Sequence, residues 1–296
     1  NENNNNPSNP SYSDNDGFDD SDTAAVKRSF YMGFTPWLYD ATVEALNWTY
    51  EKINSEGDIL SQHMEEGVPW SESLAGSPFP KSFMDEINTR VSRHVDGKKT
   101  LLSINPLNVG RNGLALKRGE GVSEPLDSPW SSYALNSAEV KTAFLNYTRR
   151  MIEYFSPDYL LIGIEVNLMI RNNVSLWPQY IELHKYLYSE LKKRHPKLPI
   201  GVSVFCVPYF PQWSQEDNLE KQMKGLNDLA PYIDYLAFSV HPFMSALLAE
   251  SFPENYLEQL FSITKKPVAV SESSYPAQVW TTTGNNPLTF KGSEEK

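Results

Sequence analysis

Two glutamates, Glu165 and Glu272, hold the positions in this sequence that are best suited to chemistry. Each follows an apolar run, Glu165 in "YLLIGIEVN" and Glu272 in "PVAVSESSYP". Burial or a neighbouring negative charge lets a carboxyl keep its proton near neutral pH. Hydrogen bonds from Ser271, Ser273 and Tyr275 would favour the ionised form of Glu272. The pair therefore has the chemistry of a proton donor and a nucleophile.

Seven short apolar runs must position these glutamates, and helical patterns lie between the runs. The runs cover residues 29–37, 58–64, 99–106, 159–166, 199–207, 233–242 and 267–276. The helical stripes begin at Val43, Phe83, Val140, Leu183 and Leu219. Apolar strands that alternate with helices indicate an α/β fold with a parallel sheet covered on both faces. Two architectures fit this pattern, a doubly wound sheet and a (β/α)8 TIM barrel.

The ends of the predicted strands favour the barrel. A nucleotide-binding doubly wound fold would carry a Gly-rich phosphate turn, and neither G-x-G-x-x-G nor G-x-x-x-x-G-K-[ST] occurs. Nearly every strand ends instead in polar or aromatic residues, which in a barrel meet on the face where active sites lie. An eighth strand is not evident before Lys296. We therefore predict a (β/α)8 barrel that is C-terminally truncated or incomplete.

The same strand ends supply the residues that we expect to bind substrate. They are Trp37, His63, Glu65, Asn105, Asn167, His241, Tyr275 and Trp280. Structural roles remain the alternative for several of them: His63 with Glu65 would brace the barrel mouth, and His241 would orient Glu272 or pack in the core.

The tryptophans point to a carbohydrate ligand. All but Trp48 fall in predicted loops after strands, namely Trp37, Trp70, Trp130, Trp177, Trp213 and Trp280. Indole faces stack on sugar rings, although large aromatics also anchor loops by packing. The loop over residues 106–136 would form one wall of a cleft. Its Arg111, Lys117 and Arg118 would contact an acidic sugar, unless the loop is simply solvated.

The arrangement resembles glycoside hydrolase clan A, the retaining (β/α)8-barrel glycosidases, and within it the endo-β-1,4-galactanase-like and related endoglycanases. "PDYLLI" and "IGIEVN" carry the resemblance, which covers roughly residues 29–280. It implies that Glu165 is the acid/base and Glu272 the nucleophile of a retaining hydrolysis, for which the carboxyls stand about 5–5.5 Å apart. Members commonly have Asn before the acid/base, contacting the sugar 2-hydroxyl. This chain has Ile164 there, and Asn167 is the candidate substitute.

We therefore predict a retaining, endo-acting glycoside hydrolase that acts on a β-linked polysaccharide. A non-catalytic carbohydrate-binding protein on a degenerate barrel is the alternative, favoured by Ile164 and the missing strand. A metal-dependent barrel enzyme is less favoured, because no pair among the five histidines has H-E-x-x-H or H-x-H spacing. We expect no metal and no cofactor. Nucleophilic serine chemistry lacks its G-x-S-x-G motif.

The remaining features concern partners and location. A net charge of −11 argues against nucleic acid, and no apolar run reaches the ~18 residues of a membrane span. Residues 1–25 predict an acidic, Asn-rich disordered tether before a catalytic domain over residues 26–296. In "DNDGFDDSD", Asp oxygens that recur around a Gly turn are compatible with weak calcium binding, although the spacing is not that of an EF-hand; a solvated acidic linker is the alternative. The tether suggests a secreted, cell-surface or periplasmic protein, compatible with a lipid anchor before residue 1. The sequence does not predict an oligomeric state.

Overall fold

The computed structural model describes residues 28–210, 218–241, 255–274, 278–283, 287 and 289–290. Contacts divide the chain into two units, Asn1–Tyr31 and Met32–Lys296, and the second unit holds every described helix and strand. The predicted tether over residues 1–25 lies outside the described residues, so its boundary with the catalytic domain stays a prediction.

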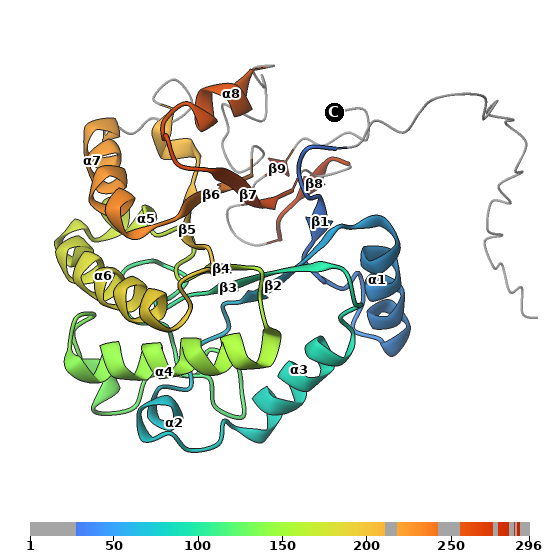
Figure 1. Cartoon of the computed structure of the whole chain (residues 1–296), viewed down its shortest axis with the longest axis horizontal. Helices are drawn as coiled ribbons and strands as arrows, with labels where there is room; N and C mark the ends of the chain where they lie inside the picture. Colours follow the sequence, from blue (N-terminus) through green and yellow to red (C-terminus); the bar gives the residue numbers. More distant parts are fainter. Residues whose placement is uncertain are drawn as a thin grey trace, which may run out of the picture. The chain divides into compact units, whose positions relative to one another are not determined.

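Seven parallel strands form one sheet whose order follows the chain, and Figure 1 shows the sheet curling. The strands are β1 (Gly33–Phe34), β2 (Ile59–Met64), β3 (Lys99–Ile104), β4 (Tyr159–Leu161), β5 (Ile200–Phe205), β6 (Tyr235–Val240) and β7 (Val268–Ser273). A separate antiparallel pair consists of β8 (Trp280–Thr281) and β9 (Thr289–Phe290). The predicted class is confirmed: this is a (β/α)8 barrel architecture without an eighth parallel strand among the described residues.

Helices connect successive strands and cover the outer side of the curl (Figure 1). The α-helices are α1 (Val43–Glu56), α2 (Trp70–Ala75), α3 (Lys81–Ser92), α4 (Ala138–Phe155), α5 (Leu168–Asn172), α6 (Trp177–Arg194), α7 (Leu219–Leu229) and α8 (Tyr256–Phe261). Short 3-10 turns are η1 (Trp130–Ser132), η2 (Val174–Leu176), η3 (Val207–Tyr209) and η4 (Ala230–Tyr232). The five predicted stripes are confirmed as α1, α3, α4, α6 and α7.

Helix α4 shows how the sequence specifies an outer helix. Its apolar stripe over Val140, Phe144, Tyr147 and Met151 recurs every three or four residues, so one face of the helix is apolar. All four side chains are buried in the main core, between the helices and the sheet. The helix ends at Ser156, which has a φ of +44° and donates its N–H to the Ile152 carbonyl.

A second, smaller core fills the inner face of the curl. Alternate residues of a strand share one face, and Leu101 of β3, Leu161 of β4, and Tyr235 and Ala237 of β6 form one buried cluster there. Gly201 of β5 leaves room for Tyr235, because a Cβ at this position would stand 2.5 Å from the Tyr235 carbonyl oxygen and 3.1 Å from carbons of its ring. Contacts between strands so far apart in the sheet are possible only because the sheet is curled.

The inner face becomes polar toward the carboxyl ends of the strands. Buried serines follow the apolar layer at two-residue spacing: Ser61 of β2, Ser103 of β3, Ser203 of β5 and Ser239 of β6. Because side chains alternate between the two faces, the residue two positions after each serine also points to the inner face. The fold therefore separates a packed base from a polar rim.

We expect Phe144→Ala to destabilise the protein by about 3–5 kcal/mol, because it removes a fully buried ring from the contact between α4 and the sheet. Urea denaturation followed by circular dichroism measures the change. Val174→Ala, at a position that is 52% exposed, is the control and should stay within about 0.5 kcal/mol of the wild type. Equal stabilities of the two variants would contradict this account of the core.

Candidate active site

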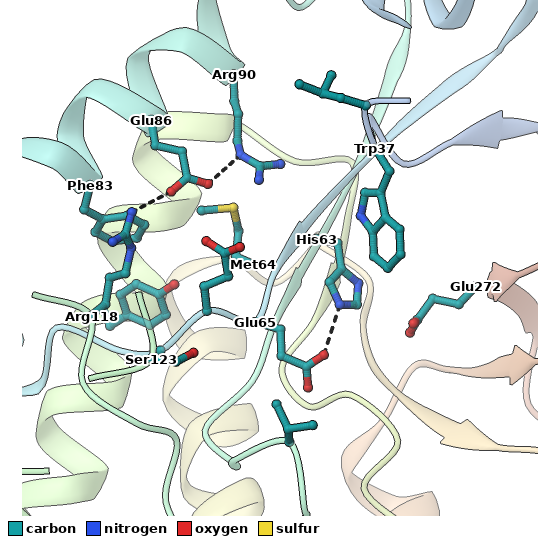
Figure 2. Close-up of a pocket in the computed structure, with 15 residues that line it drawn as sticks. Trp37, His63, Met64, Glu65, Phe83, Glu86, Arg90, Arg118, Ser123 and Glu272 are labelled. Carbon is teal, nitrogen blue, oxygen red and sulfur yellow. Dashed lines mark hydrogen bonds and ion pairs between the residues drawn. The ribbon is translucent and has the colours of Figure 1, made fainter. Parts of the chain in front are cut away.

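The carboxyl ends of the strands bring most of the predicted site residues to one rim of the curled sheet. His63 lies on β2 and Glu65 directly follows that strand; Asn105 follows β3, His241 follows β6, and Glu272 lies on β7. Figure 2 shows Glu272 pointing from one side of the site toward His63 on the other. The curl of the sheet thus joins its early and late strands at this rim.

Glu165 stands in a turn rather than on a strand. Strand β4 ends at Leu161, so the predicted strand over residues 159–166 was too long. The turn remains attached to β5, because the Glu165 N–H donates to the Ser203 hydroxyl at 2.9 Å and the Val166 N–H to the Ser203 carbonyl at 3.0 Å. Glu165 has a φ of +50°, which costs a residue with a side chain about 1–2 kcal/mol. Such strain is concentrated at functional sites.

Arg111 ties Glu165 to Glu65. It comes from the loop after β3 and is 2% exposed. Its Nη1 lies 2.5 Å from Glu65 Oε1 and its Nη2 lies 3.2 Å from Glu165 Oε2. Arg111 also has a φ of +50°, and its Nη1 donates to the Asn108 carbonyl at 3.0 Å. The planar guanidinium therefore fixes the two carboxylates relative to each other.

The sequence analysis considered Arg111 only as a cation for an acidic sugar, together with Lys117 and Arg118. Each of the three instead pairs with carboxylates of the chain: Arg111 with Glu65 and Glu165, Lys117 with Asp127, and Arg118 with Glu86. No spacing rule connects a loop arginine with carboxylates on other strands. The local signal was the tight "GRNG" turn at 110–113, which places Arg111 in its left-handed conformation.

The pKa of Glu165 is raised to about 7. Burial is the largest cause, because the neutral form tolerates loss of water better than the charged form. The positive charge of Arg111 acts in the opposite direction, while the negative charges of Glu272 and Glu65 raise the pKa further. Glu165 therefore keeps its proton into the neutral range, as a general acid must.

Glu272 faces the inner side because of an irregularity between β6 and β7. Phe238 lies opposite Val270, whereas the next residue of β6, Ser239, lies opposite Glu272. One extra residue, Ser271, is therefore accommodated in β7 as a bulge. Side chains alternate along a strand, so without the extra residue Glu272 would point to the opposite face. The bulge re-aims this carboxylate into the site.

Ser239 contacts both glutamates. Its hydroxyl donates to Glu272 Oε1 at 3.1 Å, and its hydrogen bond to the Glu165 side chain acts to lower the pKa of that carboxyl. Ser239 is fully buried. The two carboxyls therefore lie on either side of one hydroxyl. This arrangement provides an acid with a raised pKa beside a second, hydrogen-bonded carboxylate.

His63 and Glu65 form a pair beside the two glutamates. His63 Nε2 lies 3.3 Å from Glu65 Oε2. Burial acts to lower the pKa of His63, but the hydrogen bond to Glu65 and the negative charge of Glu272 outweigh it, so the net shift is upward. For Glu65, burial acts to raise the pKa, and the His63 hydrogen bond with the Arg111 charge lowers it overall. The pair thus extends the charge network from Glu165 to β2.

The two predicted asparagines differ in their surroundings. Asn105 is 2% exposed; its Nδ2 donates to Glu65 Oε1 at 2.9 Å and its Oδ1 accepts the Ile164 N–H at 3.3 Å. It therefore supports the turn that carries Glu165. Asn167 is 1% exposed and begins α5, where its side chain bonds the Phe205 backbone and Gln222. The structure does not bring the Asn167 side chain to the glutamate pair.

Of the other predicted binding residues, His241 and Trp37 reach the site. His241 Nδ1 lies 2.8 Å from the Ser274 hydroxyl; burial is the main cause of its lowered pKa, and the Glu272 charge opposes it. Trp37 is 74% exposed, and its ring meets His63 edge-on at 6.4 Å between centroids. Tyr275 and the side chain of Trp280 lie outside the described residues.

A cavity of about 570 Å3 opens beside these residues (Figure 2). Trp37, His63, Glu65 and Glu272 line one end of it. A smaller cavity of about 260 Å3 shares Glu65 in its lining, so the two adjoin at that residue. Volumes of this size suit a small organic ligand.

The tryptophans were predicted to lie on the cleft face, and for three of them this was wrong. Trp70 and Trp130 are buried and stack at 5.5 Å between centroids, and Trp177 is buried against Tyr180. These indoles pack the helices and loops onto the main core, which is the alternative considered for large loop aromatics. Trp213 lies outside the described residues.

The described residues show neither a metal centre nor a membrane-spanning helix. No group of three or more His, Cys, Asp or Glu side chains there is arranged to hold a metal ion. Among the same residues, no helix has both the length and the apolar character needed to cross a bilayer.

Comparison with solved structures identifies the fold of this site. A structure of fungal β-1,4-galactanases has a TM-score of 0.51 at 16% identity, covering 79% of this chain and 67% of that chain. The GH53 catalytic domain of Ignisphaera aggregans has a TM-score of 0.46 at 17% identity. That match covers 77% of this chain and 59% of the Ignisphaera chain. No protein-family model and no curated protein matches the sequence. The predicted resemblance to clan A glycoside hydrolases is confirmed in the fold.

We expect Arg111→Gln to raise the pKa of Glu165 above about 7, because it removes the positive charge that opposes burial. A carbon-13 NMR titration of the Glu165 carboxyl measures this without any assay of activity. Arg111→Lys keeps the charge and should shift the pKa less, and Arg194→Gln, on an exposed pair with Glu153, should leave it in place. An unchanged or lowered pKa in Arg111→Gln would rule out this balance of charges.

We expect Glu165→Gln to stabilise the protein, and by more at pH 8 than at pH 4. In the wild type the folded-state pKa of about 7 exceeds the ordinary value of 4.5, so the unfolded chain loses this proton first. Wild-type stability therefore falls as the pH rises from about 4.5 through about 7. Glutamine has no such dependence. Urea denaturation at several pH values measures the difference, with Glu44→Gln as an exposed control; a difference that shrinks with pH would contradict the raised pKa.

Proposed function

We propose that this chain is a retaining, endo-acting glycoside hydrolase that acts on a β-linked polysaccharide. Glu165 is its acid/base and Glu272 its nucleophile. The observation that carries the proposal is the buried Ser239 hydroxyl, which bonds both carboxyls, beside the pKa of Glu165, which is raised to about 7. A carboxyl that keeps its proton near neutral pH, beside a second carboxyl that accepts a hydrogen bond, supplies a proton donor and a candidate nucleophile.

The geometry supports retention of configuration rather than inversion. Inverting enzymes need room for a water molecule between their carboxyls, which lie about 6.5–9.5 Å apart, whereas retaining enzymes hold them about 5–5.5 Å apart. Glu165 and Glu272 share one serine hydroxyl. A single bridging hydroxyl favours the shorter separation.

In the first step the Glu272 carboxylate attacks the anomeric carbon while Glu165 gives its proton to the departing glycosidic oxygen. The products are a glycosyl ester on Glu272 and an ionised Glu165. Arg111, in contact with Glu165 Oε2, stabilises the new negative charge. The hydrogen bond from Ser239 to Glu272 weakens as the ester forms, because the ester oxygen carries less negative charge than the carboxylate.

In the second step the ionised Glu165 takes a proton from a water molecule that attacks the same anomeric carbon. The ester bond to Glu272 breaks, and the sugar is released with its original configuration. Glu165 is then protonated again, and its pKa of about 7 suits both directions of proton transfer. Trp37, exposed beside Glu272 in the cavity lining, is available to stack on a sugar ring.

A non-catalytic carbohydrate-binding protein is the second candidate, and Ile164 favours it. The resemblance expects an asparagine here to contact the sugar 2-hydroxyl, whereas Ile164 is fully buried and apolar. Asn167 does not take over this role, because its amide bonds Phe205 and Gln222. Such a protein would bind a glycan through Trp37 and the charged rim without cleaving it.

Export of the protein to the cell surface, periplasm or medium is part of the proposal. A polysaccharide is too large to enter a cell unaided, so the enzyme has to meet it outside. The acidic, Asn-rich residues 1–25 have the composition of a tether between an anchor or leader and a folded domain.

We expect the wild type to release reducing ends from one member of a panel of β-linked polysaccharides, with β-1,4-galactan tested first. Glu165→Gln and Glu272→Gln should each lower the rate by roughly 10²-fold or more, because each lacks a group needed for bond cleavage. Glu44→Gln, exposed in the first turn of α1, is the control and should keep full activity. Cleavage that survives in Glu272→Gln would exclude this residue as the nucleophile.

Azide assigns the two roles separately. With an activated aryl glycoside, azide should restore turnover to Glu272→Gly with an inverted glycosyl azide as product, and to Glu165→Ala with a retained one. Wild type that binds a glycan by calorimetry but cleaves none of the panel would support the carbohydrate-binding alternative.

A further inference from the structure

The large cavity extends beyond the glutamate pair to a second polar end. Its near end is lined by Trp37, His63 and Glu272, whereas its far end is lined by residues of α3, of α4 and of the loop after β3. Figure 2 shows this far end as the group around Glu86, on the opposite side of Glu65 from Glu272. The mechanism above uses no residue of it.

Glu86 organises the far end. Its Oε1 accepts from Arg90 Nε at 2.9 Å and its Oε2 from Arg118 Nη2 at 2.8 Å. Arg118 is held in turn by the Gly121 carbonyl at 2.8 Å and lies over the Phe83 ring, 5.0 Å from its centroid. The wall is therefore prebuilt by charge-assisted bonds and needs little reorganisation to bind a ligand.

Two groups on this wall have no hydrogen-bond or ion-pair partner among the described residues. The hydroxyl of Tyr147, a residue that is 1% exposed, is buried and has no hydrogen-bond partner. Leaving such a group unpaired costs about 1–3 kcal/mol, so a ligand that pairs it gains affinity. Glu66 is exposed on the same lining, and its carboxylate makes no hydrogen bond or ion pair among the described residues. The wall thus presents both a hydroxyl and a carboxylate acceptor.

The charges of this wall favour a neutral ligand. The two arginines share Glu86, and Glu66 supplies a second negative charge, so the four side chains balance. Lys117 of the same loop is occupied by Asp127 and Glu124, and Arg111 by Glu65 and Glu165. Among the described residues that line this cavity, no cation lacks a carboxylate partner with which it could neutralise a uronate or a sulfate instead. Hydroxyl groups, which both donate and accept, match the wall instead.

The cavity also indicates which side of the scissile bond it serves. Its lining includes Glu272 but not Glu165. The nucleophile bonds the ring that stays on the enzyme, whereas the acid faces the ring that leaves. Rings that extend from Glu272 along this cavity therefore belong to the non-reducing side of the substrate.

We propose that Tyr147, Glu66, Glu86 and Arg90 form a distal subsite that binds a neutral, hydroxyl-bearing sugar ring on the non-reducing side of the cleavage point. This subsite rests on the proposed function, which it deepens by naming the substrate class as an uncharged polysaccharide. It makes binding depend on the length of the chain, because only oligosaccharides that reach from Glu272 to Glu86 occupy it.

The test is a calorimetric titration of the inactive Glu272→Gln protein, with and without Tyr147→Phe. The probes are neutral β-1,4-linked galacto-, manno-, gluco- and xylo-oligosaccharides of two to six residues. Tyr147→Phe should weaken binding of the longest ligands roughly three- to tenfold, the loss of one hydrogen bond, and leave disaccharides unaffected. Tyr180→Phe is the matched control, because the Tyr180 hydroxyl is equally buried and unpaired but does not line the cavity.

A second variant and a second ligand test the charge argument. Glu66→Gln should weaken the same long ligands, with Glu51→Gln on the exposed face of α1 as its control. The longest ligand with its terminal CH2OH group oxidised to a carboxylate should bind more weakly than the neutral one. Tighter binding of the oxidised ligand, no binding of any neutral ligand, or equal effects of Tyr147→Phe and Tyr180→Phe would each overturn the subsite.

Hydrolysis assays separate this subsite from the proposed function. If the wild type cleaves a polysaccharide and Tyr147→Phe leaves the length dependence of kcat/KM unchanged, the subsite is wrong while the enzyme assignment stands. If the wild type cleaves nothing and Tyr147→Phe still weakens long neutral ligands selectively, the subsite is supported and the enzyme assignment fails.

Discussion

The packing of the inner face of the sheet is the constraint on which the site depends. Leu101, Leu161, Tyr235 and Ala237 come from three strands and fill one small core. Burying them together requires the sheet to curl, since a flat sheet would leave them in water. The curl in turn carries the ends of β2 and β7 toward each other. Without it the carboxylates of early and late strands would not influence one another's protonation.

Once the strand ends converge, the site is governed by crowded negative charge. Glu65, Glu165 and Glu272 would repel one another, and Arg111 compensates by bonding two of them. The positive charge of Arg111 does not fully offset the other effects. Burial and the charges of Glu272 and Glu65 still raise the pKa of Glu165 to about 7. The left-handed backbones of both Arg111 and Glu165 show that the contact is maintained against local strain. The strained backbone and the buried carboxyl lower the free energy of unfolding, and the same arrangement lets Glu165 keep its proton near neutral pH.

The two ends of the cavity differ in their charges, and the proposed enzyme and its distal subsite each correspond to one end. At the proposed catalytic end, Glu165 and Glu272 would change charge during the reaction; Arg111 contacts Glu165, and Ser239 contacts Glu272. Around Glu86 the charges are balanced and fixed, which suits recognition without chemistry. Glu65 stands between these regions and lines both cavities. Binding energy gained at the far end can therefore position a chain for reaction at the near end.

The sequence by itself determined the alternation of strands and helices, because periods of 2 and 3.6 residues are local properties. It also predicted the polar strand ends, and with them Glu165 and Glu272 as the candidates for chemistry. Tertiary structure decided the rest. The bulge at Ser271 sets the direction of Glu272, and Arg111 finds its partners only across loops and strands. Three tryptophans are buried in the core rather than exposed on the cleft face. Whether an indole is buried depends on the residues that the fold places opposite it, and a local sequence pattern does not contain that information.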